Sequence, residues 1–407
     1  MLITVVLACF SGCNNELIEP VESPKRNILF YIATDEGNMI DNDVPTKLNE
    51  ILIGWQPGHG ELIIYADRLS KGAVMMRVND KKDDSGRYGL DTLEVYGIED
   101  SADKAVLSRS INYLTTNYPA DSYGMIFFSH ASGWLPEGTL SNPLTTRSLV
   151  IDKGSGAKHE MEMTDFAAAI PDGQFDFIVF EACLMSDVVS MYELRDKADY
   201  VLASSAEIVA PGFAYVYRKN IMDLFDTNRT VEASLQSFGQ AWDTFIKAKF
   251  QESDVYCSLT VSLLKMSEMQ ALATAAALAL QGATVKASEL KVSIDDIQTF
   301  DRPNKLISGS VRKSRYFDLA HTYENITSAA QYESFVNQLN KTVVWKAETK
   351  RFMLSGTESN PYYGEYDGFF IRRHCGLTTY IERDEYPYLN QKYEESAWYK
   401  ATRFYEL

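Results

Sequence analysis

Two short apolar segments, each followed by a reactive side chain, constrain the fold of this chain more than any other feature. Residues 124–128 (GMIFF) are followed by His130, and residues 175–180 (FDFIVF) are followed by Cys183. Apolar runs of this length, bounded by glycine or polar residues, are typical of buried strands in a parallel sheet. In such sheets, ligands bind beyond the carboxyl ends of the strands. The sequence therefore predicts an imidazole and a thiol at one edge of a sheet, as in a cysteine nucleophile with its histidine partner.

Strands and helices alternate through about residue 215, which predicts an α/β fold with a parallel sheet. The other predicted strands in this region are 27–33, 61–67, 73–78 and 200–205, and the predicted helices are 44–53, 101–115, 164–170 and 186–195. The Ser-Ala-Asp sequence at 101–103 and Thr164 are expected to cap two of these helices. Residues 225–300 are expected to be mostly helical, and the chain from 315 onward to be mixed, with a late strand at 376–381.

The size and charge of the chain exclude several classes of function. Its 407 residues, 45% of them hydrophobic, are ample for a large core and allow two or three domains. A net charge of -17 argues against a nucleic-acid partner, because phosphate neutralisation needs clustered Lys and Arg. No segment beyond the N-terminus is long and apolar enough to span a bilayer.

The N-terminus has the pattern of an export signal. Residues 1–10 (MLITVVLACF) are apolar and are followed by small residues, which is typical of a signal peptide rather than a membrane helix. The small residues end at Cys13, as in a bacterial lipoprotein signal that is cut before the cysteine and lipidated on its thiol. We expect an exported lipoprotein of the bacterial cell envelope, on the periplasmic face or the cell surface, tethered to the membrane through Cys13. No Lys or Arg precedes the apolar run, and an ordinary signal peptide with a coincidental cysteine is the alternative.

Five cysteines are present, and two of them fall in the export signal. The other three, Cys183, Cys257 and Cys375, are odd in number and widely spaced, which does not indicate a disulfide framework. No Cys-x-x-Cys pair or Cys/His cluster indicates a metal site, so we expect no cofactor, with calcium dependence left open. An unpaired thiol in an exported protein is explained if one of these cysteines is catalytic.

Cys183 is the expected nucleophile because it lies between a predicted strand and a predicted helix. The dipole of a helix beginning near Ser186 would favour the Cys183 thiolate. The backbone N–H of Cys183 would point into the same space and is expected to bind an oxyanion. His130 would act as general base for the thiol or as general acid for the leaving amine. If each residue is considered alone, Cys183 could instead be a buried structural thiol, and His130 could be a structural histidine at the end of a strand.

Each apolar run is followed by a distinctive motif: residues 130–134 read His-Ala-Ser-Gly-Trp, and residues 181–185 read Glu-Ala-Cys-Leu-Met. These motifs resemble those of the clostripain-like cysteine peptidases (peptidase family C11), which share the caspase-type fold. That family has His-Gly-x-Gly-Trp after one strand and Asp-Ala-Cys-Leu-Met after a later one. The segments 316–319 (YFDL), 375–380 (CGLTTY) and 397–402 (AWYKAT) also resemble the C-terminal part of the family, so the resemblance covers most of the mature chain.

The resemblance implies a fold and a domain organisation. It predicts a caspase-like layered α/β sandwich with a mostly parallel central sheet and a mainly helical C-terminal extension. The predicted parts are a lipoprotein signal peptide at 1–12, a linker at 13–26, a catalytic core at 27–225, and a C-terminal helical or mixed subdomain at 226–407 that completes the fold.

The resemblance also implies an activity. It predicts a secreted cysteine endopeptidase that cleaves after Arg or Lys through an acyl-enzyme, with His130 and Cys183 as its dyad. The backbone N–H groups of Ala131 and Cys183 would form the oxyanion hole. The expected partners are proteins or peptides with a basic residue before the cleaved bond (the P1 residue). Family members are often activated by cutting themselves between the two motifs, and the candidate sites here are Arg147, Lys153 and Lys158, with the bond after Arg147 first.

Two acidic residues and one aromatic residue near the motifs are candidates for substrate binding. Because the family places an acid in the pocket for the P1 side chain, Glu207 is a candidate to pair with a substrate Arg; a solvated loop carboxylate is the alternative. Glu181 is the second candidate, with a buried ion pair near the site as its alternative. Trp134 is expected either to wall the substrate cleft or to pack against the strand end.

Two departures from the family motifs bear on activity. Ala131 stands where the family has Gly. Its N–H still serves an oxyanion hole if φ is negative, whereas a positive φ would cost about 1 kcal/mol or more. Glu181 replaces Asp, which keeps the charge on a longer side chain. The rival hypothesis is therefore a catalytically inactive family member that acts as a surface binding protein.

Overall fold

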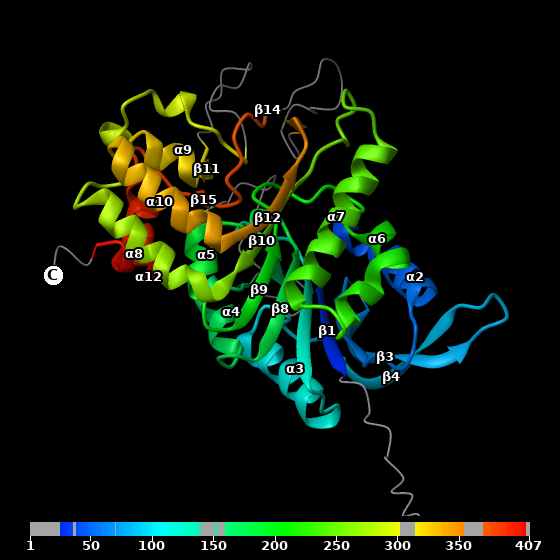
Figure 1. Ribbon diagram of the computed structural model, residues 1–407. Coiled ribbons are helices and arrows are strands. Elements are labelled where there is room, and N and C mark those ends of the chain that lie inside the picture. The colour runs from blue at the N-terminus through cyan, green and yellow to red at the C-terminus, as the bar shows by residue number, and fades with distance from the viewer. Residues whose placement is uncertain are drawn as a thin grey trace, which may run out of the picture.

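The computed structural model describes residues 25–35, 38–69, 71–137, 139, 151–152, 159–301, 314–353 and 369–403. Cys13 and the candidate cleavage sites Arg147, Lys153 and Lys158 lie outside these residues, so their roles stay predictions. Figure 1 shows a central sheet with helices on both of its faces. In the described part of the chain, every helix is too short or too polar to cross a membrane.

Within the described residues, nine strands form one sheet in the order β12-β10-β9-β8-β5-β1-β2-β3-β4. Their bounds are β1 Arg26–Ala33, β2 Leu62–Arg68, β3 Gly72–Lys82, β4 Tyr88–Gly97, β5 Ser122–Phe128, β8 Phe175–Glu181, β9 Ala198–Ala203, β10 Thr260–Lys265 and β12 Val343–Glu348. The central strands from β9 to β2 run parallel, and the strands on both flanks are antiparallel. The predicted α/β fold with a mostly parallel centre is confirmed.

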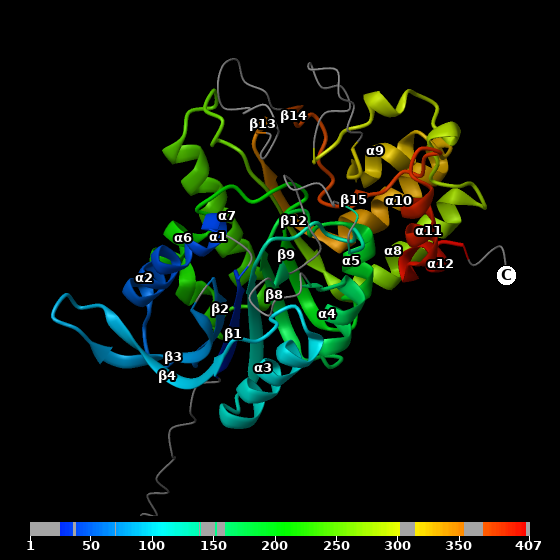
Figure 2. The same ribbon diagram turned by 180° about the vertical axis from the view of Figure 1, so that it is seen from behind.

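Different helices cover the two faces of the sheet (Figures 1 and 2). One layer contains α2 Val44–Gly54, α6 Ala214–Asn220 and α7 Val231–Lys249. The other layer contains α3 Lys104–Asn117, α4 Met163–Ala169, α5 Val188–Glu193, α8 Met269–Leu280 and α10 Ala329–Thr342. The remaining helices are α1 Asn38–Asp41, α9 Leu319–Glu324, α11 Pro387–Glu395, α12 Ala397–Ala401, η1 Ile221–Phe225, η2 Met266–Glu268, η3 Ala287–Glu289 and η4 Ile294–Asp296. The remaining short strands are β6 Ile151–Asp152, β7 His159–Glu160, β11 Phe317–Asp318, β13 Arg351–Phe352, β14 Phe369–Phe370 and β15 Thr378–Thr379.

Alternating side chains of the central strands fill the space under both helix layers. In β1, Leu29 and Tyr31 pack in one apolar cluster, whereas Ile28, Phe30 and Ile32 pack in the other. Every residue of β1 is buried, as expected for a parallel strand that is covered on both faces. The rigid centre of the sheet therefore supports the loops that follow its strands.

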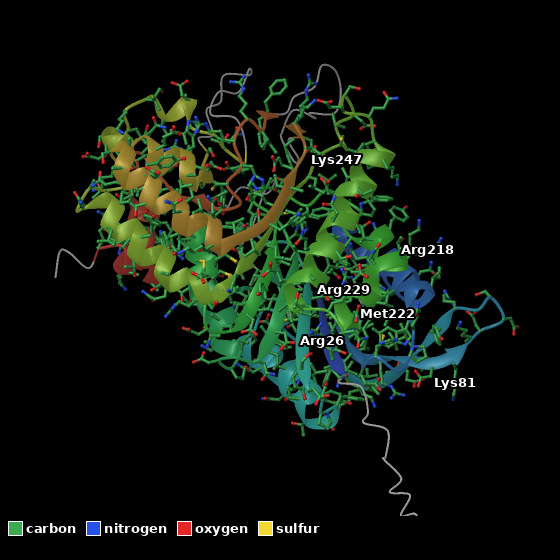
Figure 3. All side chains as sticks on the ribbon, in the orientation of Figure 1. Arg26, Lys81, Arg218, Met222, Arg229 and Lys247 are labelled. Carbon is green, nitrogen blue, oxygen red and sulfur yellow. The ribbon has the colours of Figure 1, made fainter. Side chains whose placement is uncertain are left out.

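Basic side chains on the α2–α6–α7 layer have acidic neighbours within the protein. Figure 3 labels Arg218 on α6 and Lys247 near the end of α7. Arg218 Nε lies 2.7 Å from Glu50 Oε2 of α2, and Lys247 Nζ lies 2.6 Å from Asp243 Oδ1. In both pairs the basic side chain is about half exposed, whereas Glu50 and Asp243 are buried, so each cation offsets the charge of a carboxylate that is largely shielded from water.

The region 225–300, predicted to be mostly helical, contains a strand that was not predicted from the sequence. β10 (TVSLLK) lies beside β9 and pairs with it in the antiparallel direction. Val261 and Leu263 of this strand join one apolar cluster, and Leu264 joins the other. Residues 226–407 therefore contribute β10 and β12 to the same sheet as the strands of the predicted core.

Two further expectations about local structure are wrong, and one is confirmed. Thr164 does not cap a helix, because α4 begins one residue earlier and Glu162 occupies the cap position. The late strand predicted at 376–381 is reduced to β15, which pairs with β11. The cap predicted within 101–103 is confirmed, since the Asp103 side chain accepts a hydrogen bond from the N–H of Ala105 at 2.8 Å.

Candidate active site

The two residues predicted as a dyad follow neighbouring strands. β5 and β8 pair in parallel, with Phe128 opposite Glu181 at the end of their ladder. His130 and Cys183 each come two residues after this pair, so both lie beyond the same carboxyl edge of the sheet. That edge is where open α/β sheets bind ligands. The structure thus brings an imidazole and a thiol to one edge.

The Cys183 thiol is half-buried against the segment that follows β9. The backbone N–H of Ile208 donates a hydrogen bond to Sγ at 3.3 Å. Burial, and next the negative charge of Glu207, raise the pKa of Cys183 to about 12, against a smaller lowering effect of the Ile208 N–H. The resting thiol is therefore neutral near pH 7.

The expectation that a helix dipole would favour the Cys183 thiolate is wrong. α5 begins at Val188 rather than near Ser186, and it has only six residues. The dipole acts mainly within the first turn of a helix. A helix this short, which begins five residues after Cys183, does not offset the effect of burial on the pKa of the thiol. The thiolate has to form by proton transfer to a base during the reaction, which is the role predicted for His130.

The turn after Cys183 has a strained backbone and is hydrogen-bonded to the segment that follows β9. Leu184 has a φ of 61°, in the left-handed region that costs a non-glycine residue roughly 1–2 kcal/mol. Its N–H donates to the carbonyl of Ala206 at 2.9 Å, and the N–H of Ser186 donates to the carbonyl of Ser204 at 2.9 Å. The segment after β9 therefore fixes the backbone of the nucleophile turn, and Glu207 belongs to this same segment.

The loop after β5 packs closely against the turn after β8. Gly133 in that loop has a φ of 54°. A Cβ on Gly133 would come within 2.6 Å of both the Asp187 Oδ2 atom and the Leu184 carbonyl oxygen. Glycine is required here for its backbone conformation and for the close approach of the two loops.

Residues from the C-terminal half of the chain support the loop that carries His130. Tyr316 donates a hydrogen bond from its hydroxyl to the carbonyl of Ser132. The Trp134 ring packs against Tyr380 and Tyr393, with ring centroids 5.1 and 5.7 Å apart. Trp134 is only 7% exposed, so it packs at the strand end, which was one of its two predicted alternatives.

Ala131, which replaces the glycine of the family motif, carries no backbone strain. Among the described residues, Leu184 and Gln281 are the only non-glycine positions with positive φ. Ala131 therefore has a backbone conformation that any residue adopts, and its methyl group is buried at 2% exposure. The oxyanion-hole role of its N–H stays a prediction.

Glu181 is held in a buried network rather than facing solvent. Its carboxylate forms an ion pair with Lys47 Nζ and accepts hydrogen bonds from the Tyr217 hydroxyl at 2.7 Å and from the Phe213 N–H at 2.6 Å. Glu181 is 2% exposed and Lys47 is 1% exposed. The structure therefore shows the alternative expected for Glu181, a buried ion pair near the site, rather than a substrate-facing acid. Glu207 is then the predicted acid whose charge acts on the Cys183 thiol.

Lys47 is a partner of Glu181 that was not predicted from the sequence. Lys47 Nζ also donates to the carbonyl of Pro211 at 2.8 Å and lies 4.2 Å from the centre of the Phe128 ring. The sequence does contain a sign that Lys47 is buried. Lys47 has helical spacing with the buried residues Val44 and Ile51, so it falls on the apolar face of its helix. A lysine on such a face needs a buried acid, and Glu181 is that acid.

A second polar cluster surrounds His374. Its Nδ1 lies 2.9 Å from Glu348 Oε2, and its Nε2 lies 3.2 Å from Ser205 Oγ. The neighbouring Cys375 thiol donates instead to the carbonyl of Leu377 at 3.1 Å, so His374 and Cys375 belong to separate networks. In the part of the chain that the structure describes, no group of three or more His, Cys, Asp or Glu side chains is arranged to hold a metal ion.

Comparison with known proteins agrees with this arrangement of motifs. The model of the clostripain family, peptidase C11, matches residues 31–406. Among curated proteins, clostripain from Hathewaya histolytica is 31% identical over 123 residues, which is 28% of this chain and 23% of that protein. The aligned part thus spans about a quarter of the length of this relative.

Two solved structures match most of the chain. The inactive zymogen of a C11 protease from Parabacteroides distasonis is 26% identical, with a TM-score of 0.75, and the match covers 93% of this chain and 99% of that one. A secreted C11 cysteine protease from Bacteroides thetaiotaomicron, solved in complex with an irreversible peptide inhibitor, is 25% identical, with a TM-score of 0.76 and the same coverage. Both the caspase-like fold and the resemblance in the motifs are confirmed. Because the family model spans nearly the whole chain, this protein belongs to the clostripain family of C11 cysteine peptidases.

Proposed function

We propose that this protein is a cysteine endopeptidase with Cys183 as nucleophile and His130 as its acid–base partner. The observation that carries the proposal is the shared edge, where both residues follow the paired ends of β5 and β8. Family membership supports it, as does the similar Bacteroides protease whose structure holds a peptide inhibitor.

The proposed reaction proceeds through a thioester. His130 takes the proton from the Cys183 thiol while sulfur attacks the carbonyl carbon of the peptide bond, and the carbonyl oxygen becomes an oxyanion. The backbone N–H groups of Cys183 and Ala131 would stabilise this oxyanion. His130 then gives its proton to the leaving amine, and the C–N bond breaks. Finally, water activated by His130 attacks the thioester, which releases the acid product and restores the thiol.

We further propose that Glu207 pairs with an Arg or Lys side chain at P1. Glu207 is the acid whose charge acts on the Cys183 thiol, whereas Glu181 is only 2% exposed and so is shielded from a substrate. A cationic side chain beside Glu207 would offset the charge that raises the pKa of Cys183. Binding of a basic substrate would therefore make the thiol easier to ionise.

The experiment that tests the proposed function is hydrolysis of a matched set of fluorogenic peptides that differ only at P1. Wild-type protein is expected to release fluorophore from the Arg and Lys peptides at least about 100-fold faster than from the Ala and Glu peptides, because a basic side chain forms a charge-assisted pair. Equal rates on all four peptides would contradict the proposed basic preference. No release by folded protein, whether cut or uncut within 135–160, would contradict the peptidase activity.

Replacing Glu207 with Gln is expected to change two measurements in opposite directions. Loss of the charge lowers the pKa of Cys183, so iodoacetamide should alkylate the thiol faster at mildly alkaline pH. Loss of the carboxylate should reduce kcat/KM for the Arg peptide by about 10- to 100-fold. Glu333→Gln on α10, an exposed position, removes the same charge far from the thiol and should change neither value. Unchanged turnover of the Arg peptide in Glu207→Gln would rule out Glu207 as the P1 acid.

We also propose that the protein is exported, lipidated at Cys13 and activated by its own cleavage between the two motifs. The pattern of residues 1–13 supports the first two points. The basic residues Arg147, Lys153 and Lys158 between the motifs support the third, as does the similarity to a C11 zymogen. Intact mass of the purified protein measures both changes, since acyl chains add mass and a cut separates the chain into two masses.

An inactive family member that binds peptides without cleaving them is the second candidate. Burial and the charge of Glu207 raise the pKa of Cys183, which lowers the fraction of thiolate available to attack a peptide and so favours this candidate. The peptide set decides between the two, because an inactive member would bind the Arg peptide without releasing fluorophore.

A further inference from the structure

Asp187 lies where three segments of the site meet. It follows the turn that carries Cys183 and lies at the start of α5. The loop after β5 approaches it through Gly133, and Thr378 of β15 forms a parallel bridge with it. Asp187 is 1% exposed, so it is enclosed by these segments.

We propose that Asp187 is a positioning residue that holds the His130 loop against the Cys183 turn, an inference that rests on the dyad proposed above. The contact with Gly133 is the main argument. The space that a side chain on Gly133 would need is taken by Asp187 Oδ2 and by the Leu184 carbonyl oxygen, each 2.6 Å from the Cβ position. Gly133 is three residues after His130, and Leu184 directly follows Cys183. The side chain of Asp187 therefore fills the contact between the two dyad loops.

The two carboxyl oxygens of Asp187 have different surroundings. The Oδ1 atom accepts the N–H of Ser190 at 2.9 Å and caps α5. The Oδ2 atom has no hydrogen-bond partner among the described residues. The Ser190 side chain and the backbone N–H groups of Ser190, Val189 and Trp134 favour the charged form of the carboxyl group. Burial outweighs these donors and raises the pKa of Asp187 to about 7. A carboxyl group that is costly to bury is thus kept at the junction of the loops.

Capping alone does not account for an aspartate at this position. Ser, Thr, Asn and Asp cap helices about equally well, and the caps of α7, α10 and α12 here are Thr230, Ser328 and Ser396. A serine at 187 would cap α5 without the buried second oxygen. What aspartate adds is the planar group that extends from the cap to Gly133.

The backbone of the nucleophile turn is tied to the C-terminal segment next to Asp187. The N–H of Thr378 donates to the carbonyl of Ser186 at 2.9 Å, and Ser186 Oγ donates to the carbonyl of Gly376 at 2.6 Å. With the turn anchored on that side, the Asp187 side chain determines how closely the histidine loop approaches. A displacement of about 1 Å between catalytic groups can cost about 100-fold in rate, so this contact bears on turnover.

The test compares Asp187→Ser and Asp187→Asn with Asp103→Ser as a matched control. The serine keeps a cap for α5 but leaves the space beside Gly133 empty, and kcat is expected to fall about 10- to 100-fold with KM within about twofold. The asparagine restores a planar side chain and should recover kcat to within about threefold of wild type. Asp103→Ser makes the same change at the cap of α3, a helix outside both dyad loops, and should leave kcat unchanged. Thermal melting confirms that each variant is folded.

Several outcomes would overturn the proposal. A folded Asp187→Ser protein with wild-type kcat would mean that the side chain only caps the helix, and a change in KM alone would mean that it acts on substrate binding. Should the serine variant not fold, the asparagine variant decides, because a folded Asp187→Asn with kcat reduced more than tenfold contradicts positioning by shape.

A readout without peptides separates this inference from the proposed function. The rate at which iodoacetamide alkylates Cys183 is expected to rise at least about threefold in Asp187→Ser, because a loosened turn leaves the thiol less buried, and to stay unchanged in Asp103→Ser. If wild-type protein cleaves nothing, the proposed function fails while this rate still tests the contact. If wild-type protein is active but the alkylation rate and kcat of Asp187→Ser are unchanged, only the positioning role fails.

Discussion

Replacing Cys183 with Ala is expected to lower the rate of peptide hydrolysis by about 10⁴-fold or more while the protein stays folded. The sulfur forms the covalent bond in the proposed reaction, and Cys183 is the described thiol that follows the strand paired with the strand before His130, whereas the Cys375 thiol donates to the carbonyl of Leu377. The thiol is half-buried in a turn that backbone hydrogen bonds hold, so the smaller methyl group should be tolerated. Release of fluorophore from the Arg peptide measures the effect.

The matched control for this variant is Cys375→Ala, which removes another half-buried thiol without touching the dyad. It should keep wild-type turnover. Intact mass gives a second comparison: wild-type protein is expected to be cut between the motifs, and Cys183→Ala to stay uncut. Substantial turnover by Cys183→Ala would show that the reaction uses another nucleophile.

Replacing Lys47 with Met is expected to destabilise the protein by about 3–5 kcal/mol, the cost of leaving a buried charge without its partner. Methionine nearly matches the length of the lysine stem, so loss of packing contributes little. Glu181 keeps the Tyr217 hydroxyl and the Phe213 N–H, but it loses the only cation paired with it among the described residues. The midpoint of urea unfolding measures the change.

Two comparisons isolate this buried pair. The double variant Lys47→Met with Glu181→Gln removes both charges, and the glutamine oxygen can accept from the Phe213 N–H while its NH2 group donates to the Tyr217 hydroxyl oxygen, so the variant should recover more than half of the lost stability. Lys197→Met breaks a pair with Asp172 in which the aspartate side chain is 75% exposed, and it should cost no more than about 1 kcal/mol. Equal effects of Lys47→Met and Lys197→Met would contradict a buried charge pair at Glu181.

The sequence predicts the parallel centre of the fold and the location of the dyad for one physical reason. The last residues of the strands before His130 and Cys183 are buried on both faces, so these strands end in short apolar runs. Because the two strands pair in parallel, His130 and Cys183, which follow these runs, come to the same edge of the sheet. Where two such strands pair, the local pattern of apolar residues is sufficient to predict that the residues after them lie at the same edge of the sheet.

Other features depend on contacts that no local pattern contains. β10 joins β9 across more than 50 residues of intervening chain, and its sequence TVSLLK is short enough to suit a helix or a strand. The Cys183 pKa was expected to fall because of a nearby helix, whereas burial and Glu207, from a later loop, raise it. Lys47 and Glu181 are 134 positions apart, so their pairing becomes visible only in the folded chain.

The pairing of β5 with β8 also determines whether the fold would survive a cut in the chain between the two motifs. The segment between the two motifs connects strands that are already neighbours, held along five register pairs from Gly124 opposite Phe177 to Phe128 opposite Glu181. A break anywhere in that connection would leave two polypeptides that share one sheet and one core. The histidine would then belong to one polypeptide and the cysteine to the other, and the active protein would be a heterodimer produced from a single gene product.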